Sequence, residues 1–159
     1  MANTETRRDS LRLRGFDYAS RRVYFVTTVV LGRRAVFQDS SLANATIECL
    51  NELKTRWRFG LYVYCLMPDH FHALVGPAES DKTLGQVVGA FKSLSTKLYW
   101  TWYEGRLWQA RYFDHIIRNV GEFVATREYV RMNPVRKGLA EDPAHWPYTA
   151  VVDEPSWWW

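Results

Sequence analysis

With 159 residues, of which 47% are apolar and 24% charged, the chain suits one globular domain with a hydrophobic core and does not suit a disordered protein. It has no apolar run near the roughly 18 residues that cross a bilayer, and its polar start is unlike a signal peptide, so we expect a cytoplasmic protein without a membrane partner. The formal charge of +4 is uneven, because residues 1–34 carry eight arginines against three acidic residues; this suggests a polyanionic partner or a solubilising arm.

The first half of the chain predicts a strand, a helix and a hairpin. Arg21–Val30 is rich in β-branched and aromatic residues and predicts the first strand. Apolar residues with helical spacing predict a helix from Ser40 to about Trp57, which Asp39 or Ser40 can cap. Phe59–Leu66 and His70–Val75 predict two further strands, and the short Met-Pro-Asp sequence between them indicates a hairpin turn.

The second half predicts a helix, a short strand and another helix. An apolar stripe predicts a helix from about Thr83 to Trp100. A fourth strand is expected within "RLWQARYFDHIIRN", residues 106–119. Asn119 and Glu122 match the N-cap and N3 positions of a capping box, which predicts a third helix that ends near Met132, before Pro134. We expect the tail of residues 149–159 to be irregular.

This order of elements predicts an α+β protein. Strand–helix–strand–strand–helix–strand is the split βαβ (ferredoxin/RRM-like) arrangement, an antiparallel sheet with helices on one face, to which this chain adds a C-terminal helix that carries a tyrosine. We expect residues 1–159 to form a single domain with a basic arm at residues 1–20. Cys49 and Cys65 lie in apolar segments and are expected to be reduced packing residues. Such a fold assigns no function by itself.

The stretch "YCLMPDHFHALV" holds the first candidate site residues. Side chains alternate along a strand, so His70 and His72 point to one face while Phe71 points to the other. The two imidazoles are therefore held side by side, next to a turn where a substrate can approach. The pair either binds a metal ion or is packed and hydrogen-bonded, and the pattern alone leaves both open.

Tyr129 and Asn133 form the second candidate pair. They are four residues apart in "REYVRMNPVRKG", which places them on the same face of a continuous helix. An oxygen-preferring divalent ion can take two imidazoles and an amide carbonyl, and a nearby tyrosine can then attack a phosphate held by that ion. The alternative is a half-buried tyrosine, with Asn133 as a C-cap before Pro134.

Other polar residues have weaker signals. His115 lies on the fourth strand and is expected to be structural, since Asp114 points to the opposite face. Several basic residues either line a phosphate track or are ordinary surface charges. They are Lys92, Lys97, Arg118, Arg127, Arg131, Arg136 and Lys137.

Taken together, these motifs resemble those of the REP-associated tyrosine transposases, relatives of the single-strand insertion-sequence transposases in the HUH nuclease superfamily. The likeness spans about residues 10–148. "CLMPDHFHALV" is similar to the histidine motif of this group, and "LWQARYFDHIIRN", "EYVRMNPVRKGLA" and "HWPYTA" are similar to its closing signature. The wider group often carries glutamine where this chain has Asn133.

The resemblance implies a metal-dependent DNA endonuclease and strand transferase. It implies that Tyr129 is the nucleophile and that His70, His72 and Asn133 bind Mg²⁺ or Mn²⁺. The expected substrate is single-stranded DNA beside hairpins of repetitive extragenic palindromes, cut through a 5′-phosphotyrosine intermediate, in a monomer or homodimer associated with the nucleoid. Candidate contacts with the DNA backbone are Arg12, Arg14, Lys92, Lys97, Arg118, Arg131, Arg136 and Lys137.

Two other functions stay open at this point. One is a DNA-hairpin-binding regulator that keeps the fold and no longer cuts. The other is a metal-dependent hydrolase of small molecules, which explains the two histidines and gives no role to Tyr129 or the basic arm.

Overall fold

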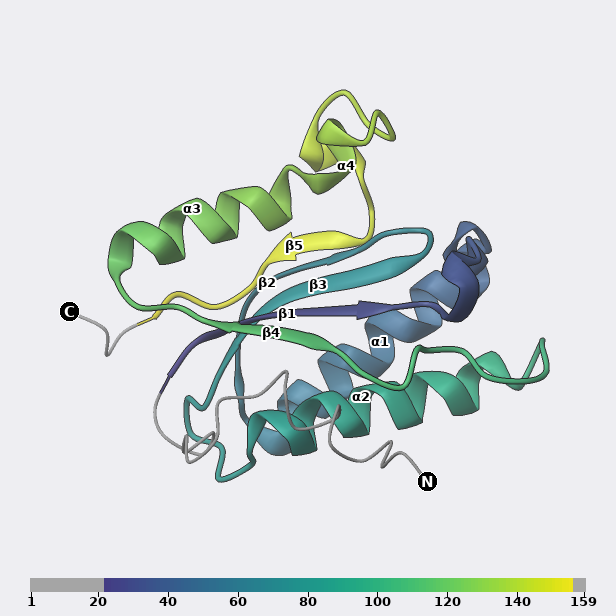
Figure 1. The fold of residues 1–159 in the computed structure, drawn as a ribbon, viewed down its shortest axis with the longest axis horizontal. Coiled ribbons are helices and arrows are strands. Elements are labelled where there is room, and N and C mark those ends of the chain that lie inside the picture. Colours follow the sequence, from purple (N-terminus) through teal and green to yellow (C-terminus); the bar gives the residue numbers. More distant parts are fainter. Residues whose placement is uncertain (1–21, 156–159) are drawn as a thin grey trace, which may run out of the picture.

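The structure is a computed structural model, and it describes residues 22–155. Its centre is a five-stranded antiparallel sheet in the order β4-β1-β3-β2-β5 (Figure 1). The strands are β1 (Tyr24–Val29), β2 (Gly60–Leu66), β3 (His70–Gly76), β4 (Phe113–Ile116) and β5 (Thr149–Val151). The α+β class and the split βαβ arrangement predicted from the sequence are confirmed.

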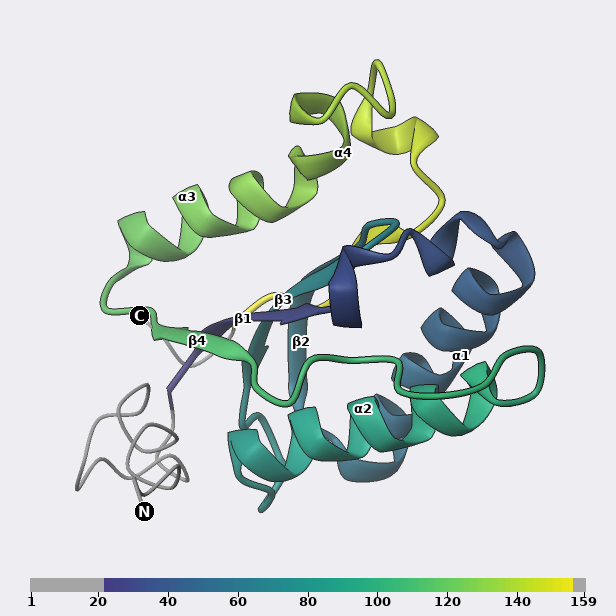
Figure 2. The same cartoon turned by 45° about the vertical axis from the view of Figure 1, so that its right-hand side comes forward.

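Helices cover both faces of the sheet. The pair α1 (Ser40–Trp57) and α2 (Leu84–Tyr99) packs against one face, and α3 (Val120–Arg131) lies over the other (Figures 1 and 2). Short helices follow β1 and α3: η2 (Leu31–Arg33), η3 (Val36–Gln38), α4 (Asn133–Arg136) and η4 (Pro143–His145). No helix among residues 22–155 is both long and apolar enough to span a membrane.

The helices begin where the sequence predicts. The Asp39 carboxylate accepts hydrogen bonds from the amides of Ser41 and Leu42 at the start of α1. Thr83 and Gln86 form a full capping box at the start of α2. The Asn119 side chain accepts from the amide of Glu122 at the start of α3, as predicted. The Glu122 carboxylate, however, binds the amide of Arg118 and the ring of His115, so the box is only half formed.

The C-terminal tail departs from expectation. We expected residues 149–159 to be irregular, which is wrong for Thr149–Val151, because these residues form β5 along the edge of β2. The Thr149 hydroxyl also donates to the carbonyl of Tyr64 at 2.7 Å. A three-residue strand is too short to show an alternating sequence pattern. It forms here because it pairs with the edge of β2.

The two faces of the sheet bury separate apolar clusters. Side chains from one face pack with α1 and α2, where the tilted rings of Phe71 and Phe91 lie 4.6 Å apart between centroids. The other face packs its smaller cluster against α3 through Phe123 and Val130. This second face also carries the two candidate histidines, His70 and His72. Phe71 faces the first cluster, as the strand alternation predicts.

Candidate functional site

A row of residues crosses the sheet under α3. His72 on β3 is opposite Thr27 on β1, and Thr27 is in turn opposite Phe113 on β4. On its other side, His72 is opposite Cys65 on β2. Residues that are directly opposite in an antiparallel pair point to the same face, so this row presents one continuous strip toward α3. His70 lies on the same face, opposite Val29.

The two imidazoles are adjacent, and each is fixed by a hydrogen bond through Nδ1. Their ring centroids are 4.6 Å apart. Nδ1 of His72 lies 2.7 Å from the Thr27 hydroxyl, and Nδ1 of His70 lies 2.6 Å from the Asp69 carboxylate. In metal-binding histidines, a hydrogen-bond partner on one ring nitrogen fixes the tautomer and the orientation of the ring, and the other nitrogen binds the metal. On both rings, Nε2 is the nitrogen that stays available as a ligand.

Burial keeps His72 neutral. Only 8% of this residue is exposed. Its pKa is lowered to about 3, chiefly by desolvation and to a smaller extent by the neighbouring His70 and Arg136. A neutral imidazole is the form that binds a metal ion, and it needs no deprotonation near pH 7.

Tyr129 projects from α3 toward this pair. Its ring centroid is 6.1 Å from that of His72 and 6.0 Å from that of Phe25, which meets it edge-on. The guanidinium of Arg136 lies against the ring, with Cζ 3.9 Å from the centroid. Tyr129 is nevertheless 47% exposed, so a large substrate can reach the side chain.

The helix that carries Tyr129 does not continue to Asn133. We expected both residues on one helical face, and this is wrong, because α3 ends at Arg131 and Asn133 is the first residue of α4. Pro134 has no amide hydrogen to continue the α3 hydrogen-bond pattern, and it is well suited to the first turn of a new helix. The Arg136 guanidinium donates to the free carbonyl of Tyr129 at 2.7 Å and so stabilises the break.

Asn133 has a buried side-chain oxygen that is free to accept a further contact. The residue is 2% exposed, and its side-chain Oδ1 has no hydrogen-bond partner. A buried amide oxygen left unpaired costs about 1–3 kcal/mol. Among residues 22–155, no group of three or more His, Cys, Asp or Glu side chains is placed to hold a metal. Imidazole nitrogens and an amide oxygen are donor types that a divalent cation accepts, and the unpaired oxygen of Asn133 is compatible with such a role.

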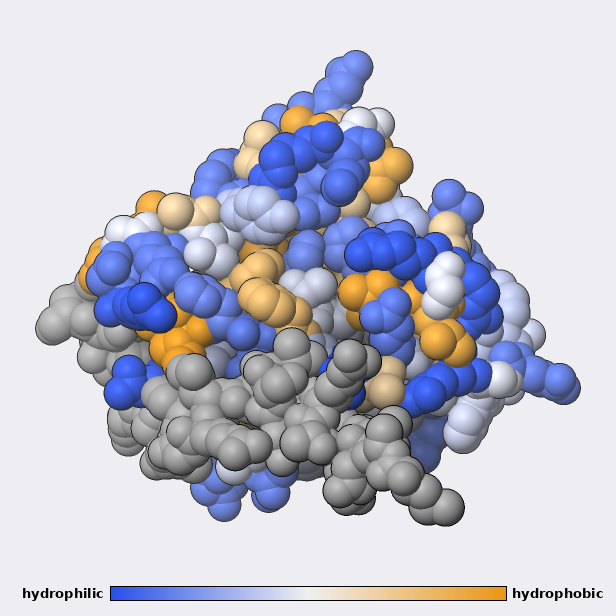
Figure 3. All heavy atoms as spheres, in the orientation of Figure 1, coloured by the Kyte–Doolittle hydropathy of each residue, from blue (hydrophilic) through white to orange (hydrophobic). Residues whose placement is uncertain are grey.

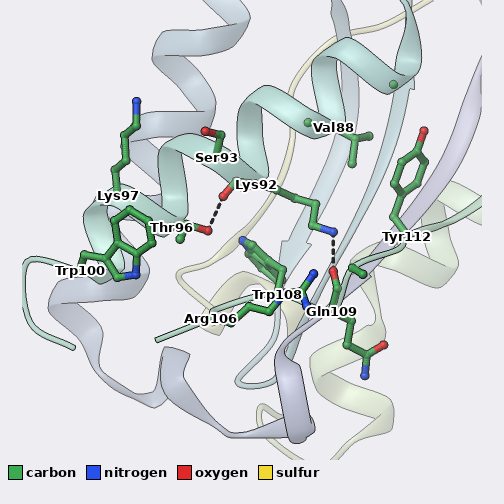
Figure 4. Close-up of a pocket in the computed structure, with 13 residues that line it drawn as sticks. Val88, Lys92, Ser93, Thr96, Lys97, Trp100, Arg106, Trp108, Gln109 and Tyr112 are labelled. Atoms are coloured by element: carbon green, nitrogen blue, oxygen red, sulfur yellow. Dashed lines mark hydrogen bonds between the residues drawn. The ribbon is translucent and has the colours of Figure 1, made fainter. Parts of the chain in front are cut away.

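Two of the predicted DNA contacts on α2 differ sharply. Lys92 Nζ donates to the carbonyls of Gln109 and Arg111 at 2.6 and 3.3 Å, across a cavity of about 470 Å³ between α2 and residues 106–112 (Figure 4). Burial, and to a smaller extent the nearby charge of Arg106, lower its pKa to about 8. Lys97 extends away from Lys92 and is exposed (Figure 4). Lys92 is thus tied to the chain, while Lys97 can reach a phosphate.

The other predicted contacts lie near α3 and α4. Arg131 makes two hydrogen bonds to the carboxylate of Glu128, at 2.8 and 2.9 Å, so its charge is already paired. Arg118, Arg136 and Lys137 are exposed. Arg12 and Arg14 lie outside the described residues, as does the whole N-terminal arm. The positive charges of Arg136 and, more weakly, Lys137 act on His72 and lower its pKa.

His115 is structural in the sense that the sequence suggested. Its Nε2 is 2.5 Å from the Glu122 carboxylate at the start of α3. This bond joins β4 to α3 and lowers the pKa of Glu122. It thereby helps to set the position of the helix that carries Tyr129.

The sequence did not predict the roles that four residues have at this site. Thr27 and Asp69 orient the two histidines, and Phe25 contacts both His72 and Tyr129. Arg136, which is also a predicted DNA contact, lies against the Tyr129 ring. Asp69 is next to His70 in the sequence and offered a signal. Thr27 and Phe25 become neighbours only through strand register, which the sequence does not specify.

A family comparison places this chain among the transposases. A family model described as "Transposase IS200 like" matches residues 19–133, a segment that contains both histidines, Tyr129 and Asn133. The chain belongs to that family.

Individual relatives agree with this assignment and with the resemblance noted from the motifs. A candidate REP-associated tyrosine transposase of Haemophilus influenzae is 25% identical over 152 residues, covering 84% of this chain and 82% of the relative. A REP-associated tyrosine transposase of Escherichia coli is 24% identical over 91 residues, which are 57% of this chain and 53% of that protein.

Solved structures show the same fold. A REP-associated tyrosine transposase bound to a REP hairpin superposes with a TM-score of 0.71, covering 87% of this chain and 82% of that one, at 20% identity. A candidate transposase of Deinococcus radiodurans gives a TM-score of 0.53 over 75% of this chain and 94% of the other, also at 20% identity.

Proposed function

We propose that this protein is a metal-dependent tyrosine transposase that cuts and rejoins single-stranded DNA beside a hairpin. The observation that carries the proposal is the position of Tyr129, an exposed phenol whose ring lies 6.1 Å from one of two adjacent, oriented and buried imidazoles. Family membership points to the same chemistry.

In the proposed reaction, the Tyr129 oxygen attacks the scissile phosphorus. The bond from phosphorus to the 3′ oxygen breaks, and that oxygen leaves as a 3′-hydroxyl after taking a proton, while the phenol loses its own proton to solvent. The product is a 5′-phosphotyrosine, which stores the energy of the broken bond and allows rejoining without ATP. His70, His72 and Asn133 would hold Mg²⁺ or Mn²⁺, which when bound supplies a positive charge that polarises the phosphate.

The protein's own residues prepare the nucleophile. Arg136, Phe25 and His72 surround the Tyr129 ring and limit its rotation. Holding a reacting group near its attack position removes part of the entropic cost of the step. The exposed charges of Arg136 and Lys137 beside it suit a phosphate backbone.

A hairpin of a repetitive extragenic palindrome is the proposed partner. The related fold with a TM-score of 0.71 is described as bound to a REP hairpin, and relatives named as REP-associated transposases match this chain. These likenesses support the same class of partner here.

A covalent-adduct assay tests the proposal. The protein is incubated with hairpin-bearing single-stranded oligonucleotides labelled at the 3′ end and with Mn²⁺, and the products are separated on a denaturing gel. We expect a labelled protein band that disappears in Tyr129→Phe and after addition of EDTA. An adduct that persists in Tyr129→Phe excludes this nucleophile. Tight hairpin binding with no adduct on any oligonucleotide would instead favour a regulator that does not cut.

A further inference from the structure

Phe113 is an exposed aromatic residue at the edge of the candidate site. It is the first residue of β4, one of the two edge strands of the described sheet. Its exposed fraction is 58%, the largest among the exposed large apolar residues of the described chain. Edge strands more often present charged residues to solvent. An exposed phenyl ring at this position is therefore unusual and is a candidate binding residue.

The register places Phe113 on the same face as the histidines. Phe113 is opposite Thr27, whose hydroxyl contacts the ring of His72. Neighbouring strands are about 4.8 Å apart, so Phe113 lies about 10 Å from His72 across the sheet.

Phe25 connects Phe113 to the nucleophile. The Phe25 ring is 6.4 Å from that of Phe113 and 6.0 Å from that of Tyr129, edge-on in both cases. Phe25 is half-buried and packs against one side of the Phe113 ring. The rest of the Phe113 side chain is exposed to solvent. Figure 3 shows apolar surface, in orange, in the middle of this face between α3 and β4.

The charges around this surface indicate its occupant. Arg111 precedes Phe113 by two residues and is exposed, and Arg136 and Lys137 are exposed on the side of Tyr129. An open aromatic ring between positive side chains is the arrangement by which proteins hold single-stranded nucleic acid, with phosphates on the cations and bases on the rings.

We propose that Phe113 is a stacking platform for the unpaired nucleobase next to the scissile phosphate. The inference rests on the proposed function, since it takes Tyr129 as the point where the phosphate lies. Stacking at Phe113 would fix the strand on one side of Tyr129 without reading the sequence, because every base has an aromatic face.

The test couples one residue to one base. Binding is measured by fluorescence anisotropy with hairpin oligonucleotides that carry a single abasic site at each successive position of the unpaired flank. All proteins carry Tyr129→Phe, so that no cleavage occurs, and Phe113→Leu is compared with Phe113→Trp. Trp102→Leu serves as the matched control, since Trp102 is 48% exposed and lies beyond the end of α2. Thermal unfolding establishes that each variant is folded.

We expect Phe113→Leu to weaken binding of the intact oligonucleotide about tenfold. The same variant should cause no further loss when one particular base is absent, Phe113→Trp should bind like the parent, and Trp102→Leu should show no coupling to any single position. A loss in Phe113→Leu that is equal for every abasic oligonucleotide, or no loss at all, would overturn the inference. Cleavage by the unmodified protein is scored separately, so a protein that binds with this coupling and never cuts would refute the proposed function and leave the stacking site intact.

Discussion

The guanidinium of Arg136 lies over the Tyr129 ring, with Cζ 3.9 Å from the ring centroid, while its Nη2 donates to the Tyr129 carbonyl at 2.7 Å. One side chain therefore holds both the ring of the candidate nucleophile and the end of its helix. The break between α3 and α4 makes this possible, because it frees the carbonyl and brings residue 136 back beside residue 129.

Replacing Arg136 should slow cleavage more than it weakens binding. We expect Arg136→Ala to reduce the rate of adduct formation about tenfold or more, because Tyr129 gains rotational freedom. Arg136→Lys keeps the charge and loses the planar group that stacks, so it should be nearly as slow as the alanine variant. Single-turnover kinetics and hairpin affinity are measured on the same proteins. If both variants lose affinity as much as rate, Arg136 is instead a phosphate contact.

The hydroxyl of Thr27 should matter for metal affinity. Thr27→Val removes the group that orients His72 through Nδ1 and should weaken Mn²⁺ binding about 10- to 100-fold in a calorimetric titration. Thr28→Val is the matched control, because the Thr28 hydroxyl is buried without a hydrogen-bond partner on the opposite face of the sheet. Equal Mn²⁺ affinity in the two variants would argue against an orienting role for Thr27.

Asn133 should show a trade-off between stability and metal binding. Asn133→Leu replaces a buried amide, whose oxygen is unpaired, by an apolar group of similar shape, so we expect the free energy of unfolding without metal to rise by about 1 kcal/mol. The same variant should bind Mn²⁺ more weakly, since one oxygen ligand is lost. Urea denaturation in EDTA and a Mn²⁺ titration measure the two effects. A variant that is destabilised in EDTA would show that Asn133 has a structural partner in the free protein.

Much of the fold was predictable because local signals agreed with one another. The caps at Asp39, Thr83 and Asn119 coincide with the start of apolar stripes, and the hairpin turn precedes His70. β5 escaped prediction because three residues carry no period, and its pairing is decided by the free edge of β2.

The site was predictable to the extent that its geometry is local. Strand alternation alone places His70 and His72 on one face. The surroundings of Tyr129 depend on contacts between distant segments, since Phe25 lies on β1 and Arg136 on α4. A helical spacing of four residues was misleading for Asn133, because Pro134 ends the hydrogen-bond pattern that the spacing assumes.

The two lysines of α2 should separate stability from DNA binding. Lys92→Ala removes the hydrogen bonds to the Gln109 and Arg111 carbonyls, so we expect a lower melting temperature and little change in the salt dependence of hairpin affinity. Lys97→Ala should leave the melting temperature unchanged and reduce the slope of log affinity against log salt by about one, the loss of a single phosphate contact. A reversal of these two patterns would assign the phosphate contact to Lys92.

The burial of His72 predicts a specific loss of stability in acid. Its pKa is about 3 in the folded protein and near 6.5 in the unfolded chain, so between these values only the unfolded chain carries the proton. The free energy of unfolding therefore falls as the pH drops from about 6.5 toward 3, by up to about 1.4 kcal/mol for each pH unit. Above about pH 6.5, His72 is neutral in both states and causes no loss of stability. Urea denaturation in EDTA between pH 4 and 7 measures this loss of stability.

Two variants separate the contribution of His72 from that of other groups. His72→Gln should lose less stability toward acid than the parent, while His145→Gln, which removes an exposed imidazole, should lose as much as the parent. Parallel curves for all three proteins would mean that His72 takes up its proton in the folded state.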